Sequence, residues 1–269
     1  MRVRIVTAVL GILAVLGLVA LGGWFLTPAV FIVAVLSLLE YQKMMANIQI
    51  PVYTLPSAIA LAVIIGSSGF YSLRIFLAAV ILSFFLLLFL VLYAKKERMN
   101  SVIYTAFSVV YFGLGFGSLS LLRGCDELLM HVNLSIEPGV FLILFALIGT
   151  WASDSFAYLV GSRFGRYKMA PHISPNKTVE GLIGGIVGAV LLCIVLSMVV
   201  GFSTTEGFFM GLLVAIMAPV GDLFESYLKR ACDVKDSGNI LPGHGGMMDR
   251  FDSLLFAAPA VLIFLSLIR

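Results

Sequence analysis

The sequence predicts an all-α polytopic integral membrane protein, on the evidence of its composition, its apolar runs and its basic residues. Of the 269 residues, 61% are hydrophobic and only 12% are charged. A soluble domain of this composition would expose large apolar patches and aggregate. The net charge of +3 is mild. It suits a protein beside anionic lipid and gives no reason to expect a nucleic-acid partner.

Nine apolar runs predict transmembrane helices, because a span needs about 20 mainly apolar residues. The first run continues directly into the second without a clear small-residue cleavage site, which favours a span over a signal peptide. We expect the helices over residues 5–22, 24–41, 55–71, 74–94, 102–122, 140–161, 180–200, 207–228 and 251–268.

The distribution of Lys and Arg predicts the orientation of these spans. If the N-terminus lies in the cytoplasm, all of the 17 basic residues except Arg74, Arg123 and Arg269 fall on the cytoplasmic side. The polar segments 162–178 and 229–250 then face the cytoplasm, where nucleotides are found. We therefore expect a multi-pass protein of the cell (inner) membrane with its active site on the cytoplasmic side.

Charge is concentrated in the C-terminal half, which predicts a functional division of the chain. Residues 1–139 supply about five N-terminal spans, and residues 140–269 supply about four spans that form a catalytic region. Asp154, Asp222, Asp249 and Asp252 lie in or beside these four spans. A carboxylate at bilayer depth is costly unless it faces a polar cavity or a partner.

Asp249 and Asp252 are three residues apart, so a helix would place both on one face. Their mutual repulsion calls for a cation, and Mg²⁺ prefers such hard oxygen ligands. Asp222, on the neighbouring span, could complete the site, whereas Asp154 is either a ligand or a support. The alternative is that these aspartates are helix caps paired with nearby Lys and Arg.

Two polar segments have the composition of phosphate-binding loops. In LPGHGGMMDR, the glycines allow a close approach of the backbone to an anion, and His244 could donate to a phosphate or close the loop. In SPNKTVEG, Ser174 with Lys177, or Thr178 with Glu180, also fits helix N-capping, which uses the same free N–H groups. The four-residue spacing of the glycines after it, from 181 to 188, predicts close helix packing.

Together these features predict phosphoryl or nucleotidyl transfer at the membrane surface, where positioning and charge neutralisation do most of the work. The sequence contains no evident Ser-His-Asp or Cys-His constellation and no HExxH motif.

The stretch SYLKRACDVKDSGNILPGHGGMMDRFDS resembles the signature of the phosphatidate cytidylyltransferases, or CDP-diacylglycerol synthases. The matching elements are Ser226, Lys229-Arg230, Lys235-Asp236, Pro242, His244 to Gly246, and Asp249-Arg250 with Asp252. SPNKTVEGLIGG resembles a second motif of this family, with Asn176 and Val179 where Lys and Trp are common, and DSFAYLVGSRFGR resembles a third. The motifs cover roughly residues 150–260.

The resemblance implies transfer of CMP from CTP to phosphatidic acid, with Mg²⁺ and a second cation that in this family can be monovalent, such as K⁺. It implies catalytic roles for Asp222, Asp249, Lys229 and Arg230, and metal ligation by Asp222, Asp249 and Asp252. The substrate-binding residues it implies are Ser174, Asn176, Lys177, Thr178, Lys235, Asp236, His244, Gly245, Gly246 and Arg250.

Two other functions remain open at this point. A CTP-dependent lipid kinase would release CDP in place of pyrophosphate. An ion-coupled transporter would use Asp154 and Asp222 as cation ligands, but it would not need glycine-rich loops. The small-residue helix faces also suggest a homodimer.

Overall fold

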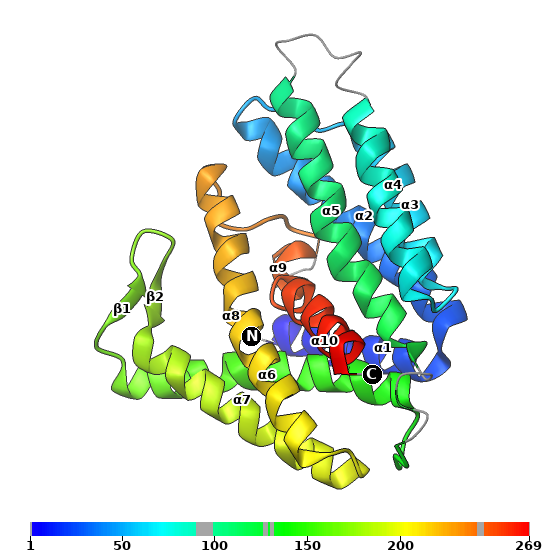
Figure 1. Ribbon diagram of the computed structural model, residues 1–269. Coiled ribbons are helices and arrows are strands. Elements are labelled where there is room, and N and C mark those ends of the chain that lie inside the picture. Colours follow the sequence, from blue (N-terminus) through cyan, green and yellow to red (C-terminus); the bar gives the residue numbers. More distant parts are fainter. Residues whose placement is uncertain (1, 90–98, 126–128, 130–131, 241–244, 269) are drawn as a thin grey trace. The chain divides into compact units, whose positions relative to one another are not determined.

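The long apolar runs form α-helices in the computed structural model, which describes residues 2–89, 99–125, 129, 132–240 and 245–268 (Figure 1). The chain divides into two compact units. The first unit comprises Met1–Gly124 and Lys229–Phe251, and the second comprises Cys125–Leu228 and Asp252–Arg269. The segment that carries the glycine-rich motif is therefore grouped with the N-terminal helices.

The first unit is a bundle in which α2, α3, α4 and α5 pack side by side (Figure 1). The short helix α9 packs on α2. The helices of this unit are α1 (Arg2–Leu21), α2 (Gly23–Asn47), α3 (Thr54–Ser68), α4 (Leu73–Phe89), α5 (Met99–Leu122) and α9 (Met248–Phe251).

Aromatic side chains form the core of this bundle next to α9. Tyr41 on α2 packs edge-on against Phe112 on α5, with ring centroids 6.0 Å apart. Phe116, one turn further along α5, meets Phe251 of α9 with centroids 5.5 Å apart. Such pairs add roughly 0.5–1.5 kcal/mol beyond the area they bury. They fix the end of α9 against the bundle.

The second unit contains the other long helices and a two-stranded hairpin. Helices α6 and α7 pack against each other, and α10 packs against α6. The elements are α6 (Pro138–Phe164), β1 (Lys168–Ala170), β2 (Ser174–Thr178), α7 (Val179–Val200), α8 (Thr204–Ala231, of which the last three residues belong to the first unit) and α10 (Leu254–Ile268).

The glycine spacing on α7 does produce close packing, as predicted. A Cβ on Gly181 would lie 3.2 Å from Gly161 Cα, and one on Gly185 would lie 2.8 Å from the Ser153 carbonyl oxygen. Both neighbours are on α6. The missing side chains therefore let the two helix backbones approach closely.

The hairpin is the feature that the helical prediction did not include. β1 and β2 are antiparallel, with Lys168 opposite Thr178 and Ala170 opposite Ser174. Thr178 ends the hairpin and caps α7, since its hydroxyl oxygen accepts a hydrogen bond from Gly181 N at 3.1 Å. Of the two capping schemes considered, the structure uses the one based on Thr178.

Each predicted span coincides with a helix, but the structure supports a smaller number of membrane crossings by length and composition. Within the described residues, six helices are long and apolar enough to cross a membrane: α2, α5, α6, α7, α8 and the α9–α10 stretch. The apolar helices Val9–Leu21, Thr54–Ser68 and Leu73–Phe89 are shorter. Residues 90–94 of the predicted span 74–94, and the basic residues Lys95, Lys96 and Arg98, lie outside the described residues.

Candidate active site

The second unit brings the predicted residues Lys177 and Asp222 into direct contact. Lys177 Nζ lies 2.5 Å from Asp222 Oδ2, and both side chains are about three-quarters buried, with 25% and 29% exposed. Ser226, one turn along α8, donates its hydroxyl to Asp222 Oδ1 at 3.4 Å. Lys177 of the SPNKTVEGLIGG motif is thus paired with Asp222, which lies one turn before the start of the C-terminal motif at Ser226.

Asp154 joins this pair from α6. It is close enough to Asp222 and Lys177 for their charges to interact. The charge of Lys177 therefore acts on both carboxylates, although its ion pair is with Asp222. Asp154 is exposed to the surroundings of the chain although it lies well inside an apolar helix. An uncovered carboxylate at such a place requires water or a polar ligand beside it.

The hairpin positions Lys177, because this residue is the last but one of β2 and stands directly before the capped start of α7. Lys177 Nζ is fully enclosed. Apart from its ion pair with Asp222 it makes no hydrogen bond of regular geometry with the described residues. An ammonium group has three donors. Lys177 therefore keeps N–H groups available for a further acceptor.

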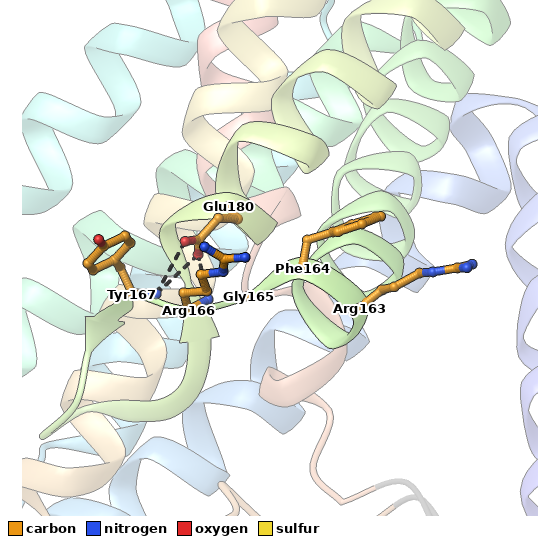
Figure 2. Close-up of a pocket in the computed structure, with 6 residues that line it drawn as sticks. All are labelled: Arg163, Phe164, Gly165, Arg166, Tyr167 and Glu180. Carbon is orange, nitrogen blue, oxygen red and sulfur yellow. Dashed lines mark hydrogen bonds between the residues drawn. The ribbon is translucent and has the colours of Figure 1, made fainter.

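A pocket lies where α6 meets the hairpin, lined by Arg163, Phe164, Gly165, Arg166, Tyr167 and Glu180 (Figure 2). Glu180 accepts hydrogen bonds from the backbone N–H groups of Arg166, at 3.1 Å, and Tyr167, at 3.3 Å. These bonds tie the segment after α6 to the first turn of α7. No residue of the predicted site lines this pocket, and its polar groups serve to hold the hairpin.

The first unit contains a second lysine–carboxylate pair, formed by Lys229 at the end of α8 and Asp249 in α9. Their Nζ and Oδ1 atoms are 2.7 Å apart, and the side chains are 12% and 8% exposed. Asp249 Oδ2 also accepts hydrogen bonds from Ser237 N at 3.1 Å and Gly246 N at 2.8 Å. Both carboxylate oxygens are therefore used within the protein.

The glycine-rich segment LPGHGGMMDR, which was predicted to bind an anion, takes part in this hydrogen-bond network. Gly245 has φ +82°, a conformation that glycine adopts without strain. The N–H group of Gly246 points at Asp249, so its role in substrate binding stays a prediction. His244 lies outside the described residues, as do residues 241–243.

The other predicted residues of the site differ in exposure, and Thr178 is buried while Ser174 is half-buried. Arg230 Nη1 donates to the Val234 carbonyl at 3.1 Å and so closes the turn that follows α8. The side chains that remain exposed are those of Asn176, Lys235, Asp236 and Arg250. They are accessible to a ligand, and their roles stay predictions.

Glu40 on α2 is a residue of this region that the sequence analysis did not identify. Its carboxylate is buried, with 1% of the residue exposed. It accepts hydrogen bonds from Met247 N at 2.8 Å, Met248 N at 2.9 Å and Ser237 Oγ at 3.2 Å. The only signal in the sequence was a carboxylate near the end of an apolar run.

Asp252 does not lie beside Asp249 on a continuous helix. It falls between α9 and α10, where its Oδ1 accepts a hydrogen bond from Ser253 N at 2.6 Å. Its backbone packs closely on Gly221, next to Asp222 in the chain. Among the described residues, Asp222 and Asp249 are each paired with a lysine. Such pairing was the alternative to metal ligation.

The donor set at Asp154 and Asp222 fits Mg²⁺ chemically. Two interacting carboxylates with a hydroxyl beside them offer the hard oxygen atoms that Mg²⁺ takes together with waters and substrate phosphates. In the described part of the chain, no three His, Cys, Asp or Glu side chains form a group that could hold a metal ion by themselves. Oxygen atoms of the substrates would have to complete the coordination shell of the ion.

Comparison with known proteins extends the similarity beyond the motif region to nearly the whole chain. The sequence model of the "Cytidylyltransferase family" matches residues 2–268. The N-terminal spans, which resembled this family only in being apolar, are therefore part of the match.

Several similar proteins carry the name phosphatidate cytidylyltransferase. The proteins from Staphylococcus haemolyticus (strain JCSC1435), Staphylococcus aureus (strain COL) and Staphylococcus epidermidis (strain ATCC 12228 / FDA PCI 1200) are 35%, 34% and 36% identical to this chain. Each similarity runs over 270 residues and covers 98% of this chain and 99% of the relative. The chain belongs to the cytidylyltransferase family.

Proposed function

We propose that this protein is a phosphatidate cytidylyltransferase, which transfers CMP from CTP to phosphatidic acid and so produces CDP-diacylglycerol and pyrophosphate in phospholipid biosynthesis. The observation that carries the proposal is the similarity, along 98% of the chain, to proteins named for this activity. The two lysine–carboxylate pairs agree with it, because the reaction requires the neutralisation of several phosphate charges.

The reaction needs little acid–base assistance. An oxygen of the lipid phosphate attacks the α-phosphorus of CTP, and the bond from this phosphorus to the bridging oxygen of the β-phosphate breaks. A phosphate monoester is already largely ionised near pH 7, so no general base has to remove a proton. The protein must chiefly hold two polyanions in line and stabilise the leaving pyrophosphate.

Lys177 is suited to bind a phosphate oxygen in the second unit. Its enclosed ammonium group has Asp222 as a counter-ion and keeps donors available. The carboxylate holds the ammonium group in place when no substrate is bound. Ser174, Asn176 and Thr178 of the same strand remain the predicted contacts to the nucleotide or to the lipid phosphate.

Lys229 and Asp249 have the corresponding arrangement in the first unit, where backbone N–H groups hold the carboxylate still. We assign Lys229 and Arg230 to phosphate oxygens, because charge-assisted hydrogen bonds from Lys and Arg are the strongest that a polyanion can accept. Further predicted substrate contacts in this segment are those of Lys235, Asp236, His244, Gly245, Gly246 and Arg250.

Asp222 is the principal proposed ligand of Mg²⁺, with Asp154 beside it, and Asp249 and Asp252 remain predicted ligands. When bound, the ion would neutralise charge on the phosphates of CTP and on the leaving pyrophosphate. A second, monovalent cation such as K⁺ is proposed on the family resemblance. The carboxylates of the chain would supply oxygen ligands next to the phosphate groups of the bound substrates.

We further propose nine crossings of the cell (inner) membrane, with the N-terminus and the site on the cytoplasmic side. The asymmetry of the basic residues supports this orientation. The three shorter apolar helices would cross with some thinning of the bilayer. The homodimer stays a prediction from the sequence, since the glycines of α7 pack against α6 of the same chain.

The test is pyrophosphate release by the purified protein in detergent, with CTP, phosphatidic acid and Mg²⁺. We expect release that requires both the lipid and the metal. Asp222→Asn, which keeps the shape but removes the charge, should lower the rate by about 100-fold or more. Asp249→Ala should also be strongly impaired.

Glu206→Gln is a matched control, since Glu206 lies on the same helix as Asp222 but in its first turn. It should keep the parental rate within about twofold. Release of CDP in place of pyrophosphate would indicate a lipid kinase. The absence of both products from folded protein would contradict a nucleotide-dependent transferase.

A further inference from the structure

We propose that Glu40 is a positioning residue for the transfer reaction, acting through the Lys229–Asp249 pair. This inference rests on the proposed function. Glu40 lies on α2, in the N-terminal part of the chain for which the sequence analysis assigned no chemistry. It contacts Ser237, which precedes the glycine-rich segment, and Met247 and Met248, which lie within it. All of these residues belong to the first unit.

Among the described residues, the carboxylate of Glu40 has three hydrogen-bond donors, which are Ser237, Met247 and Met248. Oε1 accepts from Met247 N at 2.8 Å, and Oε2 accepts from Met248 N at 2.9 Å and Ser237 Oγ at 3.2 Å. A buried carboxylate without partners would be strongly unfavourable. Here the bonds join the two ends of the segment, at residue 237 and at residues 247–248, to one rigid side chain.

Two glycines of the segment are shaped by this contact. A Cβ on Gly238 would lie 2.5 Å from Glu40 Oε1, and a Cβ on Gly246 would lie 2.6 Å from Glu40 Oε2. No side chain larger than glycine fits at either place without displacing the carboxylate. The absence of a side chain at Gly238 and Gly246 therefore lets the backbone at these two positions lie against Glu40.

Asp249 holds the same segment from another direction. Ser237 donates its backbone N–H to Asp249 and its hydroxyl to Glu40. Gly246 donates to Asp249, and the next residue, Met247, donates to Glu40. A shift of the segment at Glu40 must therefore move the donors that fix Asp249, and Asp249 in turn fixes Lys229.

Glutamine in place of Glu40 would disrupt this arrangement while conserving size. An amide offers one acceptor oxygen, and its NH₂ group can only donate. One of the two backbone N–H groups would then face another donor. The segment would lose its fixed position although the core around it stays filled.

The experiment compares steady-state kinetics of the full-length protein and Glu40→Gln in detergent, using CTP, phosphatidic acid and Mg²⁺. We expect kcat per folded molecule to fall about 10- to 100-fold, because misplacement of a catalytic group by about 1 Å has effects of this size. The KM for CTP should change by less than about threefold, as for an interaction that matters chiefly in the transition state.

Ser37→Ala is the matched control. Ser37 is fully buried on α2, one turn before Glu40, and donates to its own helix at Val33 O. This variant should keep the parental kcat. Ser237→Ala removes only the hydroxyl donor to Glu40, so its effect on kcat should be smaller in the Glu40→Gln background than in the parent.

Hydrogen exchange of the same proteins supplies a measurement that does not depend on turnover. Glu40→Gln should speed exchange in segments 237–240 and 245–251 and leave α3 unchanged. Faster exchange with kcat within twofold of the parent would overturn the proposal and leave Glu40 as a structural anchor only. Unchanged exchange would also overturn it. If the parent itself releases no pyrophosphate, the proposed function fails, and the positioning role fails with it whatever the exchange shows.

Discussion

Two lysines of the predicted site, one in each unit, are balanced by carboxylates. Lys177 faces Asp222 and Asp154, and Lys229 faces Asp249. Lysine is strongly hydrated and costly to bury without a counter-ion. The pairs therefore keep both ammonium groups in place in a largely apolar chain. Under the proposed function, an arriving phosphate would find a fixed donor and would not have to order a flexible side chain.

Lys177→Gln should lower kcat/KM for CTP by about 10- to 100-fold, because it removes a charge-assisted hydrogen bond to phosphate. It also leaves Asp154 and Asp222 to repel each other. Lys168→Gln on the neighbouring strand removes the same charge from an exposed position. Equal losses in both variants would mean that only the net charge of the hairpin matters, and the pairing would then carry no role.

Sequence patterns predicted the residues of the site that stand out locally. Asp222 and Lys177 were identifiable because charge inside or beside an apolar run is costly and has to be explained. Glu40 was not identifiable, since its partners lie 197 to 208 residues further along the chain. No local spacing reports such a contact. The spacing of Asp249 and Asp252 suggested a shared helix face, but α9 ends between them.

At the scale of elements, hydropathy predicted the helices well because each apolar run must satisfy its backbone internally within lipid. The hairpin was missed, since SPNKT contains proline and asparagine and shows no alternation of apolar residues. Its strands are three and five residues long. Their position next to capped α7 could only come from tertiary structure.

The contact between α6 and α7 gives a prediction about stability. Gly185→Ala would place a methyl group 2.8 Å from a backbone oxygen of α6, which neither helix can avoid without moving apart. We expect a loss of about 1–3 kcal/mol, as for overpacking in a tight core. Thermal unfolding in detergent measures it. Gly66→Ala, on α3 with no atom within 4 Å of the new group, should leave the midpoint unchanged or raise it.

At the scale of the whole molecule, contacts group the chain differently from its linear order. The predicted division at residue 139 separates N-terminal from catalytic helices. In the structure, segment 229–251 belongs with the N-terminal helices. Hydropathy contains no information about which helices share a unit, so this grouping could not be predicted from the sequence. As a functional boundary, residue 139 stays a prediction.

The proposed orientation can be tested with single cysteines on either side of α7. Tyr167 and Thr205 are exposed. In intact cells, a membrane-impermeant maleimide should label Thr205→Cys, and it should label Tyr167→Cys only after permeabilisation. The reverse result would contradict an N-terminus in the cytoplasm.

The native cysteines should contribute little background to this labelling. Cys125, Cys193 and Cys232 are all free and buried. Burial, followed by the nearby Asp233 carboxylate, raises the pKa of Cys232, so less of the reactive thiolate is present at any given pH.

The contact between Glu40 and Met247 also has a consequence for how the protein is made. These residues are separated by 207 positions, so a ribosome adding about 5–20 residues per second needs roughly 10–40 s to pass from one to the other. Until Ser237 is added near the end of that interval, α2 carries a carboxylate whose partners have not yet been synthesised. The nascent chain therefore lacks the backbone donors to Glu40 until the first residue of α9 has been added. A product truncated before residue 247 lacks both backbone donors to this acidic group.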